Sequence, residues 1–196
     1  MPVTYTNRKG QMYVLCQGTT KNGKPRYYFS REAKDEALEQ IPVGYRISES
    51  VNGIVSLVKD QPQFIYPEEV AILEAALKQH PKGRNYRVSV KRDQILIYEL
   101  VGPDAEEISA IFGKFSIFPV GRTTEKIQER LDQTARFTPA VRLTLVDAEQ
   151  RTYIAERWCY LGSIDDWVGV DSPDKLEALA RRLAPKLGTE DFFDLY

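Results

Sequence analysis

The sequence predicts an α+β protein in which antiparallel β-hairpins pack with several amphipathic helices. Pairs of short runs rich in β-branched and aromatic residues flank turn dipeptides such as Asn-Gly, which indicates hairpins. Apolar residues at helical spacing occur between these pairs, with capping residues before them. Because strands and helices rarely alternate one by one, antiparallel sheets are favoured over a parallel sheet. The 196 residues, 42% of them hydrophobic, suffice for a sizeable core.

The first sixty residues are expected to form two hairpins. Asn22-Gly23 and Asn52-Gly53 favour two-residue turns in which both residues have positive φ. The polar segment between the hairpins, residues 31–40, is expected to form a short helix. The expected strand pairs are residues 12–17 with 24–30 and residues 46–50 with 54–58.

A helix and a third hairpin are expected next. Pro67 is a favourable first helical residue, acidic residues follow it in the first turn, and the helix is expected to end at His80. Residues 86–90 alternate between apolar and polar, turn at residues 92–93 and return through residues 95–100. The return strand is almost entirely apolar, so we expect it to be buried on both faces.

The C-terminal half is expected to hold three more helices and a fourth hairpin. The expected elements are a helix capped by Asp104 with Ile108, Ile111 and Phe112 facing inward, a helix that begins at Thr123 or Thr124 after an apolar stretch at residues 115–118, a hairpin of residues 141–145 and 151–161, and a helix that begins at Ser172-Pro173. Ser163 followed by Asp166 is typical of a helix start. The apolar C-terminal residues, Phe192, Phe193, Leu195 and Tyr196, are expected to dock against the protein.

Composition bounds the domain organisation and the location. A proline-containing connector at residues 59–67 predicts an N-terminal two-hairpin module at residues 1–60 and a helix-and-hairpin domain at residues 61–196. No apolar segment is long enough to cross a bilayer and no signal-peptide core is present, which favours a soluble cytoplasmic protein without a membrane partner. Cys16 and Cys159 are expected to be buried free thiols. Zinc-ligand spacings and glycine-rich phosphate loops are absent, so we expect no cofactor.

Charge is unevenly distributed along the chain. Residues 1–31 contain six basic side chains and no acidic one, so the other residues together carry a formal charge of −7, against −1 for the whole chain. A two-residue turn at residues 22–23 places residues whose numbers sum to 45 opposite each other. One side of the hairpin is then expected to collect Val14, Cys16, Tyr27 and Phe29, and the other Tyr13, Gln17, Thr19, Lys21, Lys24, Arg26 and Tyr28.

The second of these sides predicts a nucleic-acid-binding surface within residues 8–31. A basic two-stranded ribbon can lie in a nucleic-acid groove, and tyrosines can stack on unpaired bases. The candidate binding residues are Lys21, Lys24, Arg26, Tyr28 and Tyr13. The same cations also have a structural explanation, because lysines and Pro25 on an edge strand discourage edge-to-edge pairing. The expected function is a non-catalytic binding protein whose favoured polyanionic ligand is nucleic acid.

Two other classes of function stay open. Asp165, Asp166 and Asp171 are weak candidate ligands for a divalent cation, although helix capping explains this acidic run more simply. A metal-dependent phosphodiesterase or nuclease could use these carboxylates or those of residues 147–156. A subunit of a protein assembly could contact its partner through the aromatic residues at the C-terminus. The single histidine, His80, matches no hydrolase signature, so no catalytic residue is assigned.

Four stretches of the chain resemble a family of bacterial proteins with no assigned activity. These stretches are Tyr-Thr-Asn-Arg-Lys-Gly from Tyr5, Gly-Lys-Pro-Arg-Tyr-Tyr-Phe-Ser from Gly23, Ile-Pro-Val-Gly-Tyr from Ile41 and Arg-Trp-Cys-Tyr-Leu-Gly-Ser-Ile-Asp-Asp-Trp from Arg157. The resemblance spans both ends of the chain and implies no site residue. More faintly, the basic hairpin is similar to the arm-binding domains of tyrosine recombinases, but a second hairpin follows it here and no recombinase catalytic domain does.

Overall fold

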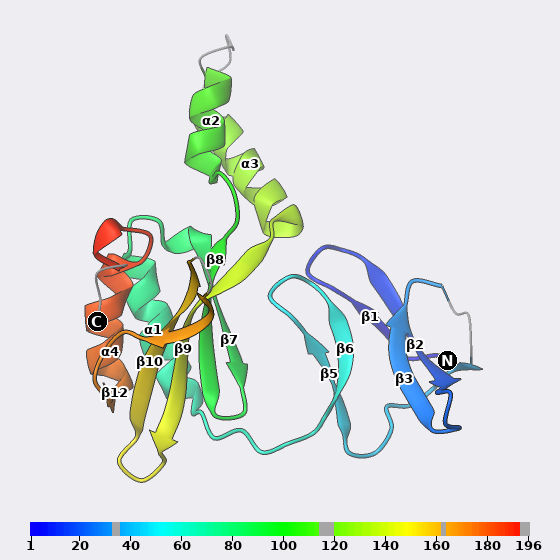
Figure 1. The fold of residues 1–196 in the computed structure, drawn as a ribbon. Helices are drawn as coiled ribbons and strands as arrows, with labels where there is room; N and C mark the ends of the chain where they lie inside the picture. Colours follow the sequence, from blue (N-terminus) through cyan, green and yellow to red (C-terminus); the bar gives the residue numbers. More distant parts are fainter. Residues whose placement is uncertain (33–35, 114–119, 162–163, 193–196) are drawn as a thin grey trace. The chain divides into compact units, whose positions relative to one another are not determined.

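The computed structural model describes residues 1–32, 36–113, 120–161 and 164–192 of the chain (Figure 1). Helices and antiparallel sheets make up the described part, which confirms the predicted α+β fold. Contacts divide the chain into two compact units. Unit 1 consists of Met1–Gln61 and Gly102–Arg136, and unit 2 of Pro62–Val101 and Phe137–Tyr196. The predicted boundary between residues 60 and 61 stays a prediction, and residues 102–136 lie in the sequence between two strands of unit 2.

Unit 1 contains two small antiparallel sheets and a pair of helices. Its elements are β1 (Thr4–Thr6), β2 (Met12–Thr19), β3 (Pro25–Ser30), β4 (Glu36–Ala37), β5 (Tyr45–Glu49), β6 (Val55–Lys59), α2 (Ala105–Gly113) and α3 (Val120–Thr134). In the first sheet β2 is central: β3 pairs with one of its edges, and β1 and β4 pair with the other. The second sheet is the β5–β6 hairpin. Both hairpins predicted in the first sixty residues are therefore present.

Unit 2 is built on one larger antiparallel sheet. Its elements are α1 (Pro67–Gln79), β7 (Tyr86–Lys91), β8 (Gln94–Leu100), β9 (Phe137–Asp147), β10 (Thr152–Leu161), β11 (Ile164–Gly169), β12 (Asp174–Lys175), α4 (Leu176–Leu183) and short 3₁₀ segments at Gly83–Asn85, Ala184–Lys186 and Glu190–Phe192. The strand order is β11-β10-β9-β8-β7, and β12 also pairs with β10. The third and fourth predicted hairpins are β7–β8 and β9–β10.

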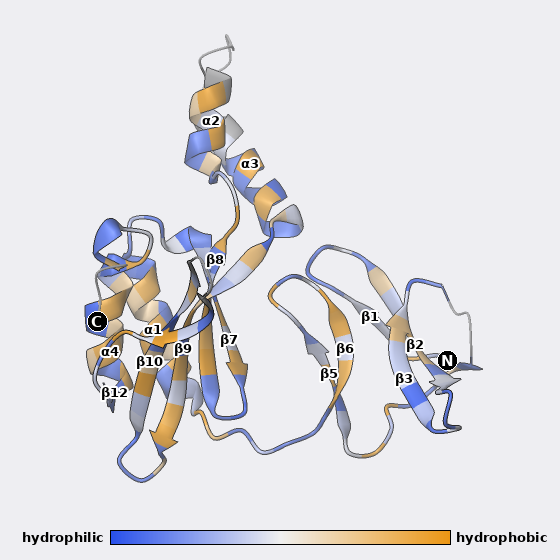
Figure 2. Ribbon diagram, viewed as in Figure 1, coloured by the Kyte–Doolittle hydropathy of each residue, from blue (hydrophilic) through white to orange (hydrophobic). Residues whose placement is uncertain are grey.

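The core of unit 2 lies between this sheet and the helices α1 and α4. Alternate residues of the central strands enter it, and Figure 2 shows hydrophobic residues concentrated along β8 and β9. The fully buried side chains include Leu73, Ile95, Ile97, Val141, Leu143, Tyr153, Leu179 and Leu183. Phe192 is also buried, and its carbonyl oxygen accepts a hydrogen bond from Arg157, so its predicted docking is confirmed. Phe193, Leu195 and Tyr196 lie outside the described residues.

Two helix starts follow the sequence prediction closely. Pro67 is the first residue of α1, and the Glu69 carboxylate accepts a 2.9 Å hydrogen bond from the Tyr66 N–H. Asp104 precedes α2, and its Oδ1 accepts a 2.9 Å hydrogen bond from the Glu107 N–H. In both cases a side chain satisfies a backbone donor that the first helical turn leaves without an intrahelical partner.

Other local predictions are wrong, some of them because a predicted capping residue does not begin a helix. Ser163 lies outside the described residues, and the acidic run after it forms strand β11 instead of a helix. The last helix begins at Leu176, because β12 pairs with β10 just before it.

Two burial predictions and two element predictions also differ from the structure. Ile111 is 54% exposed instead of facing inward, and Cys159 is only partly buried. The segment expected as a helix at residues 31–40 contains β4, and α3 begins at Val120 instead of Thr123 or Thr124. Residues 115–118 are outside the described residues.

None of the helices in the described part of the chain has both the length and the apolar character needed to cross a membrane.

Candidate functional site

The β2–β3 hairpin that carries the candidate residues closes with a three-residue turn. Gly23 adopts positive φ (73°), whereas Asn22 does not. The Gly23 N–H donates to the Thr20 carbonyl oxygen, and the Thr20 N–H donates to the Lys24 carbonyl oxygen, each at 2.9 Å. The loop is thus residues 21–23, and the predicted two-residue turn is wrong. This is the common alternative for hairpins, a type I turn followed by a glycine in the left-handed region.

The same turn recurs twice more in unit 1. In residues 50–54, Gly53 has a φ of 76°, and its N–H donates to the Ser50 carbonyl oxygen at 2.8 Å. In residues 7–11, Gly10 has a φ of 72°, and its N–H donates to the Asn7 carbonyl oxygen at 2.8 Å.

A polar side chain at the first position of each turn reinforces the three-residue loop. Oγ1 of Thr20 accepts from the Lys24 N–H at 3.1 Å, Oγ of Ser50 accepts from the Ile54 N–H at 3.0 Å, and Oδ1 of Asn7 accepts from the Gln11 N–H at 2.9 Å. Local hydrogen bonds of this kind favour a turn that a dipeptide alone does not specify. The recurring pattern is a residue with a side-chain acceptor, two residues of any type and a glycine.

The extra loop residue shifts the strand register by one position. Leu15 pairs with Phe29, Gln17 with Tyr27 and Gly18 with Arg26, so facing residues have numbers that sum to 44 instead of the predicted 45. Because side chains alternate between the two faces, a shift of one residue places each side chain of β2 on the same face as a different set of β3 side chains. The predicted partition of the hairpin into one apolar and one cationic side is therefore wrong.

The structure brings three of the five candidate residues together. Arg26 and Tyr28 alternate along β3 and share one face of the sheet, and Lys24 directly precedes the strand, two positions before Arg26. Lys21 lies in the turn rather than opposite Lys24. Tyr13 lies on the other face, because it is two positions from Leu15, which pairs with Phe29.

The face that carries Tyr13 is the one against which the β5–β6 hairpin packs. The ring of Tyr27, on this face, meets the ring of Tyr45 edge to face with centroids 5.5 Å apart. The hydroxyl of Tyr5, which pairs with Tyr13, donates to Glu49 at 2.9 Å. That hydrogen bond and the negative charge of Glu49 raise the pKa of the Tyr5 hydroxyl. Tyr5 and Tyr27 thus join the two sheets of unit 1.

The cations of the hairpin have no acidic partner among the described residues. Residues 21–26 are all exposed, and Lys21, Lys24 and Arg26 form no ion pair in the described part of the chain. The Arg26 guanidinium lies 5.9 Å from the centroid of the Tyr28 ring, on the same face. We call Lys21, Lys24 and Arg26 the cationic hairpin tip. Three positive charges so close together create a local potential that attracts anions.

The carboxylates considered for metal binding are engaged elsewhere or lie apart. Asp166 accepts a hydrogen bond from the Trp167 N–H, and Asp171 accepts one from Arg182 at 2.7 Å. Asp165 is exposed on β11. Over the described residues, no group of three or more His, Cys, Asp or Glu side chains is arranged to hold a metal ion.

Two of the three carboxylates of the β9–β10 hairpin, those of Glu156 and Asp147, are also committed to local contacts. Glu156 binds Arg142 through two hydrogen bonds of 2.7 and 2.8 Å, and the Arg142 guanidinium stacks 4.6 Å from the centroid of the Trp167 ring. Asp147 accepts hydrogen bonds from two backbone N–H groups of its own turn. These contacts stabilise the sheet and its turn.

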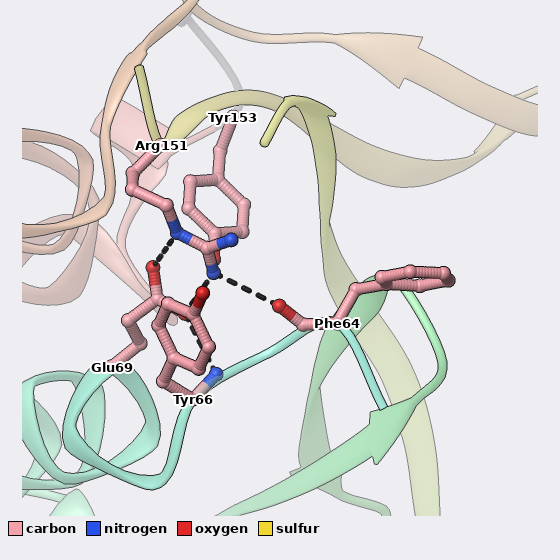
Figure 3. A network of polar contacts seen from close by, with 5 residues as sticks. All are labelled: Phe64, Tyr66, Glu69, Arg151 and Tyr153. Carbon is pink, nitrogen blue, oxygen red and sulfur yellow. Dashed lines mark hydrogen bonds and ion pairs between the residues drawn. The ribbon is translucent and has the colours of Figure 1, made fainter. Parts of the chain in front are cut away.

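A polar network at the start of α1 is the arrangement that sequence reasoning missed (Figure 3). Arg151, at the end of the β9–β10 turn, forms two hydrogen bonds with the Glu69 carboxylate, one of them 2.9 Å from Nε. Its Nη2 also donates to the Phe64 carbonyl oxygen at 3.0 Å and to the Tyr153 hydroxyl at 3.1 Å, and its guanidinium stacks 4.3 Å from the Tyr66 ring centroid. The network connects α1 to a hairpin 82 residues away in the sequence.

Two shifted pKa values and one unusual backbone angle occur within this network. Burial opposes ionisation of Glu69, but hydrogen bonds from Arg151 and Tyr66 outweigh it and lower the pKa of the carboxyl group. Burial, with the hydrogen bond and charge of Glu69, raises the pKa of the Tyr153 hydroxyl. Arg151 has a φ of 52°, which is rare for a residue other than glycine. Because its guanidinium is shared among four partners, we interpret the network as a structural clamp.

Comparison of the chain with protein-family models, with curated proteins and with solved structures finds no match. The resemblance of four sequence stretches to a bacterial family therefore stays a prediction.

Proposed function

We propose that the protein is a non-catalytic nucleic-acid-binding protein and that the cationic hairpin tip contacts the phosphate backbone. The observation that supports this proposal most directly is the combination of three exposed cations with no acidic partner in the described residues. Lysine and arginine side chains that neutralise phosphates release condensed counterions, which supplies sequence-independent affinity.

The corrected strand register changes which residues of the predicted site share a face, but it leaves the positive charge of the site unchanged. Arg26 lies on β3, Lys24 directly precedes that strand and Lys21 lies in the turn, so the three cations remain close together in the sequence at one end of the hairpin. Glu36, the acidic residue paired with β2, lies opposite Gln17 and so belongs to the other face. Among the described residues that pair in this sheet, no acidic side chain therefore shares the face of Arg26.

The test is a binding measurement on the full chain. Fluorescence anisotropy with labelled oligonucleotides of mixed sequence, both single-stranded and double-stranded, is expected to show binding at low salt. Non-specific binding of this kind has a Kd of about 10⁻⁴ to 10⁻⁶ M. Replacing Lys21, Lys24 and Arg26 together with alanine is expected to weaken it by at least about tenfold, since each phosphate contact contributes to the electrostatic affinity.

A control of equal charge separates a local effect from a general one. Lys78, Lys126 and Arg130 are exposed on helices and reproduce the composition of the tip, two lysines and one arginine. Their triple alanine variant changes the net charge by the same amount and is expected to bind as the unaltered protein does. Equal binding by the hairpin variant would contradict the proposal and leave the cations as a device that keeps edge strand β3 from pairing with other chains.

A further inference from the structure

The hairpin carries aromatic rings beside its cations, and their contacts decide which form of nucleic acid it fits. Proteins that bind single strands combine a basic surface with exposed aromatic rings on which bases stack, and each stack is a large part of the affinity. If no ring of the hairpin is open to a base, the surface is left with contacts to phosphates alone.

The rings of the hairpin are turned away from the tip or already covered. Tyr27 and Phe29 share the face against which β5–β6 packs, and Tyr27 contacts Tyr45 there. Tyr13 lies on that same face, and its hydroxyl donates to Gln11 at 3.1 Å. Tyr28 alone shares the face of the cations, is partly buried, and has the Arg26 guanidinium over its ring. The hairpin therefore offers no open stacking platform.

The shape and charge of the tip instead match a groove lined by phosphates. A two-stranded β-ribbon fits the major groove of B-form DNA, which is about 12 Å wide. Lys24 directly precedes β3 and lies two positions before Arg26, a separation of about 7 Å in an extended chain. Lys21 lies in the turn, ahead of both in the sequence. A ribbon that enters the groove end-on can therefore direct these cations to phosphates on the groove walls.

We propose that the ligand of the cationic hairpin tip is double-stranded B-form DNA, bound through phosphate contacts without base stacking. This inference rests on the proposed function. Duplex DNA carries more charge per length than a single strand, so contacts to phosphates alone favour the duplex. Double-stranded RNA has a deep and narrow major groove, which excludes the ribbon.

The experiment compares three probes with the full chain under one buffer condition: a mixed-sequence DNA duplex, one of its strands alone, and an RNA duplex of the same length. The DNA duplex is expected to bind at least about fivefold more tightly than either other probe. Tyr28→Leu, which keeps an apolar side chain in the partly buried position, is expected to change the affinity for the duplex by less than about twofold.

The outcomes separate this inference from the function on which it rests. Equal or tighter binding of the single strand or of the RNA duplex would overturn the inference and leave nucleic-acid binding standing. A loss of single-strand affinity in Tyr28→Leu, with folding retained, would also overturn it by revealing stacking. Failure of all three probes to bind would overturn the proposed function and the inference together.

Discussion

The clamp at the start of α1 yields a quantitative prediction because strain and ion pairing act in opposite directions at one residue. Arg151→Ala removes the two hydrogen bonds to Glu69 and keeps a residue with a β-carbon at positive φ. The two side chains are 23% and 12% exposed, so the pair lies between surface pairs, which contribute under about 1 kcal/mol, and buried pairs, whose disruption costs about 3 to 5 kcal/mol. We therefore expect Arg151→Ala to lower the free energy of unfolding by about 3 kcal/mol.

Arg151→Gly is the matched variant, because it removes the same contacts and also relieves the backbone strain. Residues with a β-carbon in the left-handed region are disfavoured by about 1 to 2 kcal/mol, so the glycine variant is expected to be about 1 kcal/mol more stable than the alanine variant. Glycine is thus expected to be the better substitute at this position, although alanine is preferred over glycine in the interior of a helix.

Urea unfolding followed by tryptophan fluorescence measures this directly, since both tryptophans of the chain, Trp158 and Trp167, belong to unit 2. With a slope of about 1 to 3 kcal/mol per molar urea, the midpoint of Arg151→Ala is expected to fall by at least about 1 M. An alanine variant as stable as the unaltered protein, or a glycine variant less stable than the alanine one, would refute the reasoning.

Two further predictions concern the same unit. Glu69→Gln is expected to be less stable than the unaltered protein, by the full difference at neutral pH and by a smaller one as pH falls below about 4.3, the ordinary pKa of a glutamate. The reason is that the carboxyl of Glu69 has a lowered pKa in the folded state. Urea midpoints measured from neutral to acid pH test this, and a difference independent of pH would contradict it. Gly83→Ala places a β-carbon 2.2 Å from the Leu77 carbonyl oxygen and is expected to cost more than about 2 kcal/mol, whereas Gly169→Ala meets no atom within 4 Å and is expected to change stability by less than about 0.5 kcal/mol; equal midpoints for the two variants would show that the close contact is not maintained.

Much of the architecture could be predicted because it depends on local patterns. Asn-Gly dipeptides and alternating apolar residues indicated four of the hairpins. Pro67 and Asp104 marked two helix starts, at which the side chains of Glu69 and Asp104 accept hydrogen bonds from backbone N–H groups. The register of β2–β3 could not be predicted from Asn22-Gly23 alone. The side-chain hydroxyl of Thr20 supports a longer loop, and the same arrangement at Ser50 indicates a signal that the dipeptide rule omits.

The clamp and the candidate surface depended on contacts between distant residues. Nothing local to Arg151 indicates a partner 82 residues away, and its positive φ is unexpected for arginine. The candidate cations could be identified from the acid-free composition of residues 1–31, but their grouping depends on a register that shifts with one turn residue. Composition therefore located the surface, and the fold was needed to show which side chains share a face.

The salt dependence of DNA binding tests the central claim most directly, because it counts the phosphates that the protein neutralises. For three cations at the tip, the logarithm of the association constant is expected to fall with the logarithm of salt concentration with a slope of about −2.7, or about 40-fold in affinity between about 50 and 200 mM. In the variant that lacks Lys21, Lys24 and Arg26 the slope is expected to approach zero. The same slope in both proteins would contradict the account, because the phosphates would then be neutralised somewhere other than the hairpin.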